Sequence, residues 1–318
     1  MADITVGYDA DGNALDYTTL TTAYTNANQY DNLQIYYSNT NQNHIWGVVL
    51  GTIISKYVSL EGMLTTPRVT YRTSNNSFVA ASGDLSSKSK ITIQNIVIIG
   101  PHVYTGTGQM NLYFYNSGAS ADGGVDFYNV TTIGAGIGFS FTGITGVCCN
   151  CMSLFNFNYG FYVSKHTVTG NGGTNEFYFC TAIGCNEYGI NIPNNSTPTV
   201  KNCISMFNGK HDITNGWGAS DVDYCAVGTA LGQQGGHMLT SQTSTNAQFM
   251  LQHANDYNIF DHRVHTSSDF VGQGVAIAGT TTDIDGQTRA DPPTIGASEG
   301  VSSFGTGGGF NLLEGPLG

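Results

Sequence analysis

Four carboxylates have the spacing that acid–base chemistry on a sugar requires. Asp221 and Asp223 are two residues apart, so on a β-strand both side chains would point to the same face. Asp126 and Glu176 join Asp221 in one column when six repeated segments of the chain are aligned. Two carboxylates that flank a glycosidic bond act as acid and as base or nucleophile in sugar hydrolysis. If the chain is an enzyme, we expect Asp126, Glu176, Asp221 and Asp223 to be its catalytic residues.

A hydrated polar face, or a stray cation site, is the alternative interpretation of these carboxylates, and we favour it. Val147 and Thr199 stand between them in the aligned column, so the carboxylates do not fall on successive repeats. His253, His262 and His265 have no regular spacing, which favours surface or core roles over a metal site. The sequence contains no GxSxG, HExxH, P-loop or dinucleotide-binding motif, and we expect no cofactor.

The elements that must position these residues are six short strand-like segments that align on one slot. The slot is occupied, in chain order, by Ile96, Val130, Cys151, Cys180, Cys203 and Cys225. The last four intervals are 21, 29, 23 and 22 residues. A small apolar residue that recurs with this period is typical of one coil of a solenoid. A second strand is expected ten residues after the slot, at Phe161, Ile190 and Ile213.

The cysteines belong to this pattern rather than to a metal or redox motif. There are seven, and their spacings match no zinc-binding pattern. Four of them share the slot with an isoleucine and a valine, so we interpret them as small apolar residues of a buried column. Neighbouring coils lie about 4.8 Å apart, which exceeds the comfortable Cβ–Cβ distance of a disulfide. We therefore predict free thiols.

Three regions are expected along the chain. Residues 1–50 form an N-terminal segment with a short amphipathic capping helix within 17–31 and a strand at 33–37. Residues 51–299 form the stack of coils, which begins with a strand at 56–63. Residues 300–318 form a Gly-rich tail that we expect to dock on a partner. The alignment also predicts an exposed ion pair between Glu187 and Lys210 on adjacent coils.

The charge balance excludes several classes of partner. Ten basic and 22 acidic residues give a formal net charge of −12. Nucleic-acid binding rests on Lys and Arg side chains that neutralise phosphates, so nucleic acid is not an expected partner, and neither is an anionic membrane. No apolar run reaches the length of a membrane span, and the first residues lack the features of a secretory signal. We expect a protein that is made in a host cytoplasm and released with a virion.

Three stretches of the sequence resemble right-handed parallel β-helix proteins of the pectate-lyase-like superfamily. They are the opening DYTTLTTAYTNANQYDNLQIYYSN with VSLEG, the coils with NCxS, YGFYV or YGINI, and the closing pattern DxDGxxR…IGAxE. The closing pattern consists of Asp283, Asp285, Gly286, Arg289, Ile295, Gly296, Ala297 and Glu299. The resemblance implies an all-β, single-stranded right-handed parallel β-helix, a solenoid with a short N-terminal capping helix and a C-terminal tail. We expect the closing residues to be structural, with Arg289 paired to Glu299 or Asp283 to pin the last coil.

The superfamily includes lyases, hydrolases, adhesins and viral spikes, so the resemblance does not decide the function. Its lyases resemble one another in using Asp/Glu clusters for Ca²⁺ and an Arg or Lys as base. None of the four arginines lies on a strand-like coil beside a carboxylate cluster, and Lys201 has no acidic trio in its column. Its hydrolases place paired carboxylates on consecutive coils with HG and RxK-like segments, which do not accompany the carboxylates here.

The lack of a coherent catalytic set favours a non-enzymatic structural or interaction subunit of a virion, such as a capsid decoration, a fibre or a tail protein. The resemblance to viral β-helices implies a homotrimer, and few charged residues suit close subunit packing, where buried charges are unfavourable. Other virion proteins, including the capsid, are expected to be contacted through residues 300–318, and surface glycan is a further expected partner. The alternatives are a tailspike-like polysaccharide lyase or hydrolase and a non-catalytic glycan-binding adhesin.

Overall fold

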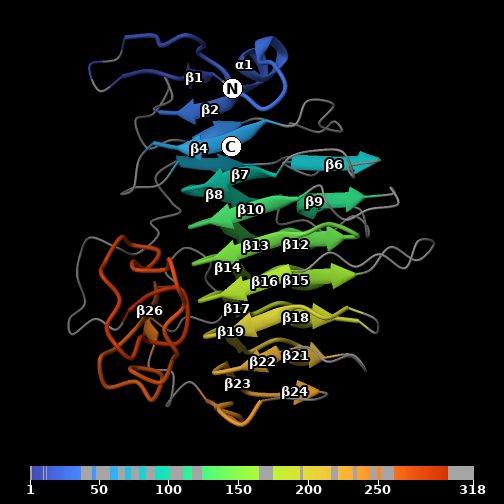
Figure 1. Ribbon diagram of the computed structural model, residues 1–318, viewed down its shortest axis with the longest axis vertical. Helices are drawn as coiled ribbons and strands as arrows, with labels where there is room; N and C mark the ends of the chain where they lie inside the picture. Colours follow the sequence, from blue (N-terminus) through green and yellow to red (C-terminus); the bar gives the residue numbers. More distant parts are fainter. Residues whose placement is uncertain are drawn as a thin grey trace.

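The backbone winds into successive coils whose strands form three parallel sheets (Figure 1). The computed structural model describes residues 2–9, 11, 13–36, 45–47, 58–63, 69–72, 79–83, 90–100, 110–116, 124–164, 175–193, 196–215, 221–231, 235–243, 249–251 and 261–299. Within each sheet, a strand pairs in parallel with the equivalent strand of the next coil. The fold is a parallel β-helix, which confirms the fold class predicted from the repeats.

The three sheets differ in length. The nine-stranded sheet contains β1 (Asp3–Val6), β2 (Asn32–Ile35), β4 (Ser59–Gly62), β7 (Ile91–Gln94), β10 (Val125–Tyr128), β13 (Gly146–Cys149), β16 (Asn175–Tyr178), β19 (Thr199–Lys201) and β22 (Asp221–Asp223). The eight-stranded sheet contains β3 (Ile45–Gly47), β5 (Val69–Arg72), β8 (Ile96–Ile99), β11 (Thr131–Ile133), β14 (Met152–Leu154), β17 (Thr181–Ile183), β20 (Ile204–Met206) and β23 (Ala226–Val227). The seven-stranded sheet contains β6 (Val79–Gly83), β9 (Met110–Asn116), β12 (Ile137–Thr142), β15 (Tyr159–Ser164), β18 (Tyr188–Ile192), β21 (His211–Asn215) and β24 (Ala230–Leu231).

The slot residues form an interior column, as predicted. All six are completely buried. The slot thiols bond to the preceding coil, since Cys180 Sγ donates to the backbone carbonyl of Cys148 at 3.3 Å and Cys203 Sγ to that of Phe177 at 3.5 Å. Six phenylalanines in stacked and edge-to-face contact pack in the same interior, together with aliphatic side chains, and they are Phe114, Phe127, Phe139, Phe141, Phe161 and Phe177.

All seven cysteines are free and buried. Burial raises the pKa of Cys149 to about 11 and that of Cys185 to about 12. Because a thiol must be accessible to react and all seven are buried, we expect dithiobis(nitrobenzoate) to label no cysteine of the folded protein within minutes. All seven should react at once in guanidinium chloride. Rapid labelling of a cysteine in the native protein would show that the surroundings of that thiol are open to solvent.

A single left-handed residue turns the chain from the nine-stranded to the eight-stranded sheet in each of six coils. These corner residues directly precede the slot, have φ between 53° and 57°, and are Asn95, Asn129, Asn150, Phe179, Asn202 and Tyr224. Asn is the non-glycine residue that tolerates this conformation best, which explains why it occupies four of the six corners. The amides of the first three form a ladder, with Nδ2 to Oδ1 distances of 3.0 and 3.2 Å.

A short helix covers the first coil and lies within residues 17–31, as expected. Helix α1 (Leu20–Asn26) is capped by Thr19, whose hydroxyl accepts the N–H of Thr22, and it buries Leu20 and Ala23 against the stack. The helix ends because Ala27 is extended, with ψ at 149°. The first strands, β1 and β2, already belong to the nine-stranded sheet, so the coils begin before residue 51.

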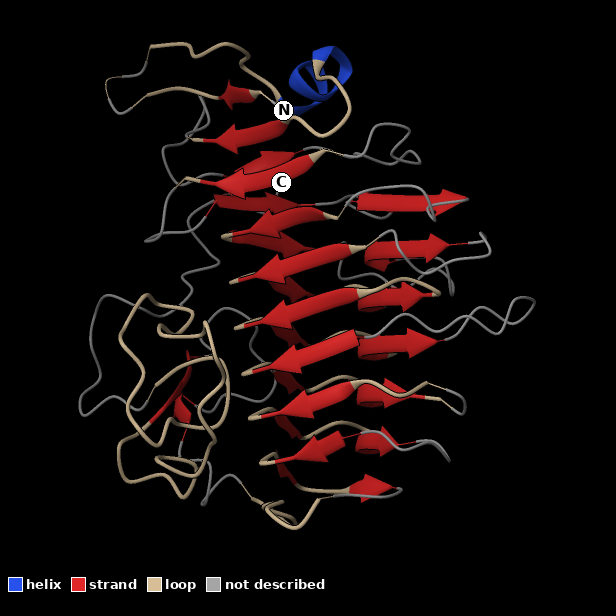
Figure 2. Cartoon of the chain, viewed as in Figure 1, coloured by secondary structure: helices blue, strands red, loops and turns tan. Residues whose placement is uncertain are grey.

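Residues 261–299, which we call the closing segment, leave the stack and lie beside it (Figure 2). They begin with β26 (Asp261–Val264), which pairs antiparallel with β25 (Phe249–Leu251), and they add no strand to the parallel sheets. An apolar cluster joins the segment to the outer face of the eight-stranded sheet. Its members are Val97, Ile99, Ile133, Met152, Leu154, Ile183, Ile204, Met206 and Ala226 of the sheet and Val264, Phe270, Ile284, Ile295 and Ala297 of the segment. The closing segment therefore covers a lateral face rather than continuing the coils to residue 299.

Within the described residues, no helix has the length and apolar character needed to cross a membrane.

Candidate functional site

The predicted column of carboxylates exists on the outer face of the nine-stranded sheet. Strand register places, in order, Asp126, Val147, Glu176, Thr199 and Asp221 side by side on successive coils. Coils are about 4.8 Å apart, so Asp126 and Glu176 start from backbone positions separated by about 9.6 Å, as do Glu176 and Asp221. The alignment was right, and no two carboxylates of this column lie on neighbouring coils.

Lysines neutralise both ends of the column. Asp126 Oδ1 lies 3.0 Å from Lys90 Nζ, and Asp221 Oδ2 lies 2.6 Å from Lys201 Nζ. Each of these two carboxylates already has a lysine as its partner on the outer face of the sheet, an arrangement typical of a hydrated polar face.

Asp223 is held by His237 at the end of the same sheet. Its Oδ2 lies 2.9 Å from His237 Nδ1, and its Oδ1 accepts the backbone N–H groups of Tyr224 and His237. The imidazole stacks on the Tyr224 ring, with centroids 4.3 Å apart. Burial alone would raise the pKa of Asp223, but the hydrogen bonds from His237 and Tyr224 outweigh it and lower the pKa. The Asp223 carboxylate is thus ionised and accepts hydrogen bonds at neutral pH. It is therefore unsuited to act as the general acid beside Asp221.

The remaining candidates do not complete a site either. Glu176 is hydrogen-bonded to Tyr178 on its own strand. His265 Nδ1 is bonded to Ser267, and His253 lies outside the described residues. In the part of the chain that the structure describes, no three His, Cys, Asp or Glu side chains are grouped so as to hold a metal ion.

Aromatic side chains gather on a different surface, the outer face of the seven-stranded sheet. We call it the tyrosine face and define it as Tyr113 and Tyr115 of β9, Tyr159 and Tyr162 of β15, Tyr188 of β18 and His211 of β21. All six side chains are partly exposed. Strands β15, β18 and β21 follow one another along the stack axis, and β12 separates β15 from β9 (Figure 1).

The rings of the tyrosine face contact one another. Tyr159 and Tyr162 are stacked with centroids 5.3 Å apart and an interplanar angle of 18°. In strand register Tyr159 pairs with Tyr188, and Tyr188 pairs with His211. Their ring centroids are 5.6 and 6.0 Å apart. Three rings on successive coils therefore form a row along the axis, each limiting the rotation of the next.

The predicted ion pair borders this row. Lys210 Nζ lies 2.6 Å from Glu187 Oε1 and 5.5 Å from the centroid of the Tyr188 ring, which confirms the pairing expected from the alignment. Glu187 is also hydrogen-bonded to Tyr159, and burial together with this carboxylate raises the pKa of Tyr159 to about 12. Lys210 and Glu187 neutralise each other and Tyr159 stays protonated, so this end of the tyrosine face carries no net charge.

The sequence analysis did not identify the tyrosine face, although the repeated Tyr-Gly pair in YGFYV and YGINI signals it. A Cβ added to Gly160 would lie 2.5 Å from the carbonyl oxygen of Gly189, and one added to Gly189 would collide with Ser205 Oγ. Glycine is required there because each position points into a close-packed corner of the interior. The residue before each glycine, Tyr159 or Tyr188, is thereby placed on the outside.

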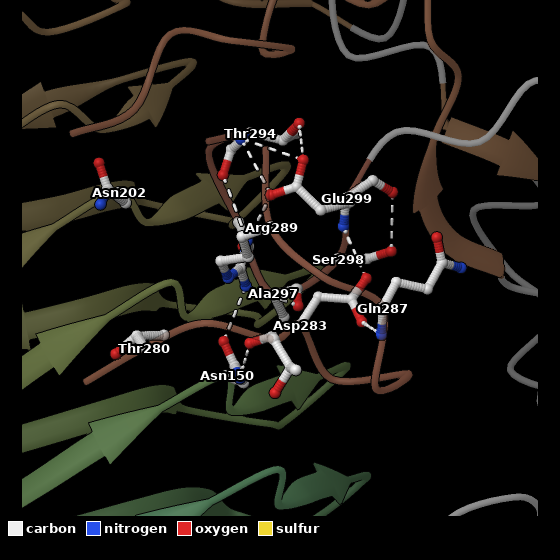
Figure 3. Close-up of polar contacts among 12 residues, drawn as sticks. Asn150, Asn202, Thr280, Asp283, Gln287, Arg289, Thr294, Ala297, Ser298 and Glu299 are labelled. Atoms are coloured by element: carbon white, nitrogen blue, oxygen red, sulfur yellow. Dashed lines mark hydrogen bonds and ion pairs between the residues drawn. The ribbon is translucent and has the colours of Figure 1, made fainter. Parts of the chain in front are cut away.

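The residues of the closing pattern form a buried polar network (Figure 3). Arg289 Nη1 lies 3.0 Å from Glu299 Oε1, and Nη2 donates to Asn150 Oδ1 at 2.7 Å. The guanidinium lies over the Phe179 ring, 3.8 Å from its centroid. Glu299 also accepts the N–H and the hydroxyl of Thr294. The predicted ion pair of Arg289 with Glu299 is thus present, and both of its charged groups are buried.

The sequence predicted that this network pins the last coil, but Arg289 attaches it to Asn150, in the middle of the stack. Asn150 is a corner residue well before the last coil, and Asn202 exchanges two hydrogen bonds with the backbone of Val275. Asp283 does not pair with Arg289 but accepts the backbone N–H groups of Gln287 and Glu299, and burial raises its pKa. The closing segment bonds to the side-chain amides of the corner residues Asn150 and Asn202. The corner residue of the last coil, Tyr224, has no side-chain amide to offer.

The strands described above define the class of the protein as a parallel β-helix protein. No family model matches the sequence. No curated protein matches it at a significant level. Among solved structures, a rhamnogalacturonan lyase is similar with a TM-score of 0.48 and 14% sequence identity, over 69% of this chain and 63% of the lyase chain. The chain thus aligns with less than two thirds of the length of that lyase, and the likeness gives no argument about activity.

Proposed function

We propose that this β-helix protein is a non-enzymatic structural or interaction subunit of a virion, such as a capsid decoration, a fibre or a tail protein. The main support is that each carboxylate that could have been catalytic is bound to its own partner. The pairs are Asp126 with Lys90, Glu176 with Tyr178, Asp221 with Lys201 and Asp223 with His237. Sugar hydrolysis requires a protonated and an ionised carboxyl that face each other across a bond, and this arrangement offers no such pair.

The proposal includes assembly into a homotrimer and contact with other virion proteins or the capsid through residues 300–318, which lie outside the described residues. The low content of charged residues, 10%, supports close packing between subunits, because few charges would need to be desolvated. Quantitative mass spectrometry of purified virus particles tests whether the protein is a virion component. A fixed stoichiometry in the particle is expected, and absence from particles would refute it.

Incubation with a panel of acidic and neutral polysaccharides tests the lack of enzymatic activity. We expect no new reducing ends and no unsaturated products above the level of a heat-denatured control. The double variant Asp221→Ala/Asp223→Ala should behave like the wild-type protein. Product that forms with the wild type and disappears in the double variant would establish a polysaccharide-degrading enzyme instead.

The tyrosine face favours a second candidate, a non-catalytic glycan-binding adhesin. Partly exposed tyrosines have a flat apolar body and a polar tip, which suits contact with a hydrated ligand. The two candidates are compatible, since a virion subunit can also attach to surface glycan.

A further inference from the structure

We propose that the tyrosine face is a site of oxidative cross-linking, at which Tyr159 forms a dityrosine bond with one of its two ring neighbours, Tyr162 or Tyr188. The co-reactant is a one-electron oxidant, such as a haem peroxidase supplied with hydrogen peroxide or a high-potential metal complex. The inference concerns a covalent modification of the protein, so it goes beyond the proposed function and does not depend on it.

The rings that would be joined already lie beside one another. The centroid of the Tyr159 ring is 5.3 Å from that of Tyr162 and 5.6 Å from that of Tyr188. All three side chains are partly exposed, so rotation about their side-chain bonds can bring two ring edges together. The rings of Tyr113 and Tyr115 are farther apart, at 6.4 Å. Tyr159 belongs to both of the closer pairs, and we expect it in every bond that forms quickly.

Glu187 prepares Tyr159 for oxidation. The pKa of Tyr159 is raised to about 12, so the phenol is protonated at neutral pH and must lose a proton together with the electron. Its hydroxyl is hydrogen-bonded to Glu187, which places a carboxylate where it can accept that proton. The Tyr188 ring instead has Lys210 Nζ 5.5 Å from its centroid, and a nearby cation opposes the removal of an electron. Tyr159 should therefore be oxidised first.

The cross-link forms by the coupling of two phenoxyl radicals. Each phenol gives one electron to the oxidant and one proton to a base, which is Glu187 for Tyr159 and water for its partner. A carbon–carbon bond then forms between the ortho carbons of the two rings. The hydrogen on each of these carbons passes through water to the phenol oxygen, which restores both hydroxyls. The protein loses two hydrogens in total. Two equivalents of a one-electron oxidant are reduced, or one hydrogen peroxide becomes two waters.

Photo-oxidation of the full-length chain tests the inference. Light, tris(bipyridine)ruthenium(II) and persulfate generate the ruthenium(III) complex, which is a one-electron oxidant. We expect the blue fluorescence of dityrosine in protein that still migrates as a single chain on a denaturing gel. The intact protein should have lost two hydrogens by mass spectrometry.

Tryptic peptides identify the residues that are joined. Trypsin cleaves after Lys165, which lies between Tyr159 and Tyr188 in the sequence. A bond between these two tyrosines therefore links two tryptic peptides, whereas a bond between Tyr159 and Tyr162 stays within one. Fragmentation of either product should place Tyr159 in the cross-link.

Two tyrosine variants separate this site from general oxidation. Tyr159→Phe keeps the ring but has no hydroxyl to oxidise, and it should lower the yield of dityrosine within the chain about tenfold or more. Tyr128→Phe removes the hydroxyl of a tyrosine that is 37% exposed on the nine-stranded sheet, and it should leave the yield unchanged. Circular dichroism checks that each variant is folded.

Two further variants test the proton acceptor. Glu187→Gln should lower the yield at neutral pH about threefold or more, because the neutral amide is a much weaker base. Its yield should recover at alkaline pH, where hydroxide takes the proton instead, and a merely structural defect would not recover in this way. Lys210→Ala removes the other member of the ion pair but leaves the carboxylate, so it should not lower the yield.

Each result has a definite meaning. Absence of dityrosine, cross-links that lack Tyr159, or bonds only between separate chains would overturn the inference. An equal loss of yield in Tyr159→Phe and Tyr128→Phe would overturn it too. If Glu187→Gln couples as well as the wild-type protein at neutral pH, Glu187 is not the proton acceptor.

Discussion

Arg289→Ala should detach the closing segment from the stack and lower the free energy of unfolding by about 3–5 kcal/mol. The Arg289 side chain is buried, and its guanidinium joins Glu299, Asn150 and the Phe179 ring. Removal of the arginine leaves Glu299 as a buried carboxylate without its cation, which is among the largest single-residue effects on stability. Chemical denaturation measures the loss, and hydrogen exchange with mass spectrometry locates it.

An exposed ion pair provides the control for this variant. Lys201→Ala breaks a pair of 2.6 Å with Asp221, whose side chain is 55% exposed, and it should cost at most about 1 kcal/mol. In Arg289→Ala, exchange should increase in residues 261–299 before it increases in the coils. If both variants lose the same stability, or if all coils open together with the closing segment, the Arg289 network does not hold the closing segment on the stack.

Asp212→Ala should lower the free energy of unfolding by about 3 kcal/mol or more, because it removes a buried carboxylate that accepts several hydrogen bonds. Asp212 is 2% exposed, and its carboxylate accepts the N–H of Asn208 at 3.1 Å, the Nδ2 of Asn208 at 2.7 Å and the N–H of Thr229 at 2.7 Å. Alanine would remove the acceptor of these three hydrogen bonds, and a hydrogen bond to a charged group contributes about 1.5–3 kcal/mol. The midpoint of urea unfolding, followed by tryptophan fluorescence, gives the loss.

Two carboxylate variants calibrate this result. Asp212→Asn keeps one acceptor oxygen and should lose less stability than the alanine variant. Asp221→Ala removes an exposed carboxylate from the neighbouring sheet and should change stability by no more than about 1 kcal/mol. Equal effects of Asp212→Ala and Asp221→Ala would mean that the buried carboxylate contributes little.

Much of the fold was predictable from the sequence because each coil of a β-helix packs its interior in a similar way. The interior slot accepts only small apolar residues, so Val130, Cys151 and Cys180 reveal the period directly. The ion pair of Lys210 and Glu187 followed from the same alignment. The path of residues 261–299 was not predictable in this way, since no period applies to a segment that docks sideways on the coils.

The candidate site was predicted less well, for a physical reason. Spacing along the chain showed which carboxylates share a column, but it could not show that Lys90 and Lys201 reach across to neutralise them. The tyrosine face depends on rings from strands whose register is set by the interior. Its sequence signal is the glycine after Tyr159 and Tyr188, which is informative only once that position is known to face inward.

The long sequence separation within the closing network has a consequence for how the protein folds during synthesis. Asn150 and Arg289 are 139 residues apart in the chain, and the ribosome needs on the order of ten seconds to cover that distance. The coils around Asn150 can form in that interval, while the apolar outer side of their sheet still lacks its cover. A nascent chain with an exposed apolar side is prone to aggregation and is a natural client for a chaperone. Truncation after β24 should therefore yield a product that forms strands but precipitates.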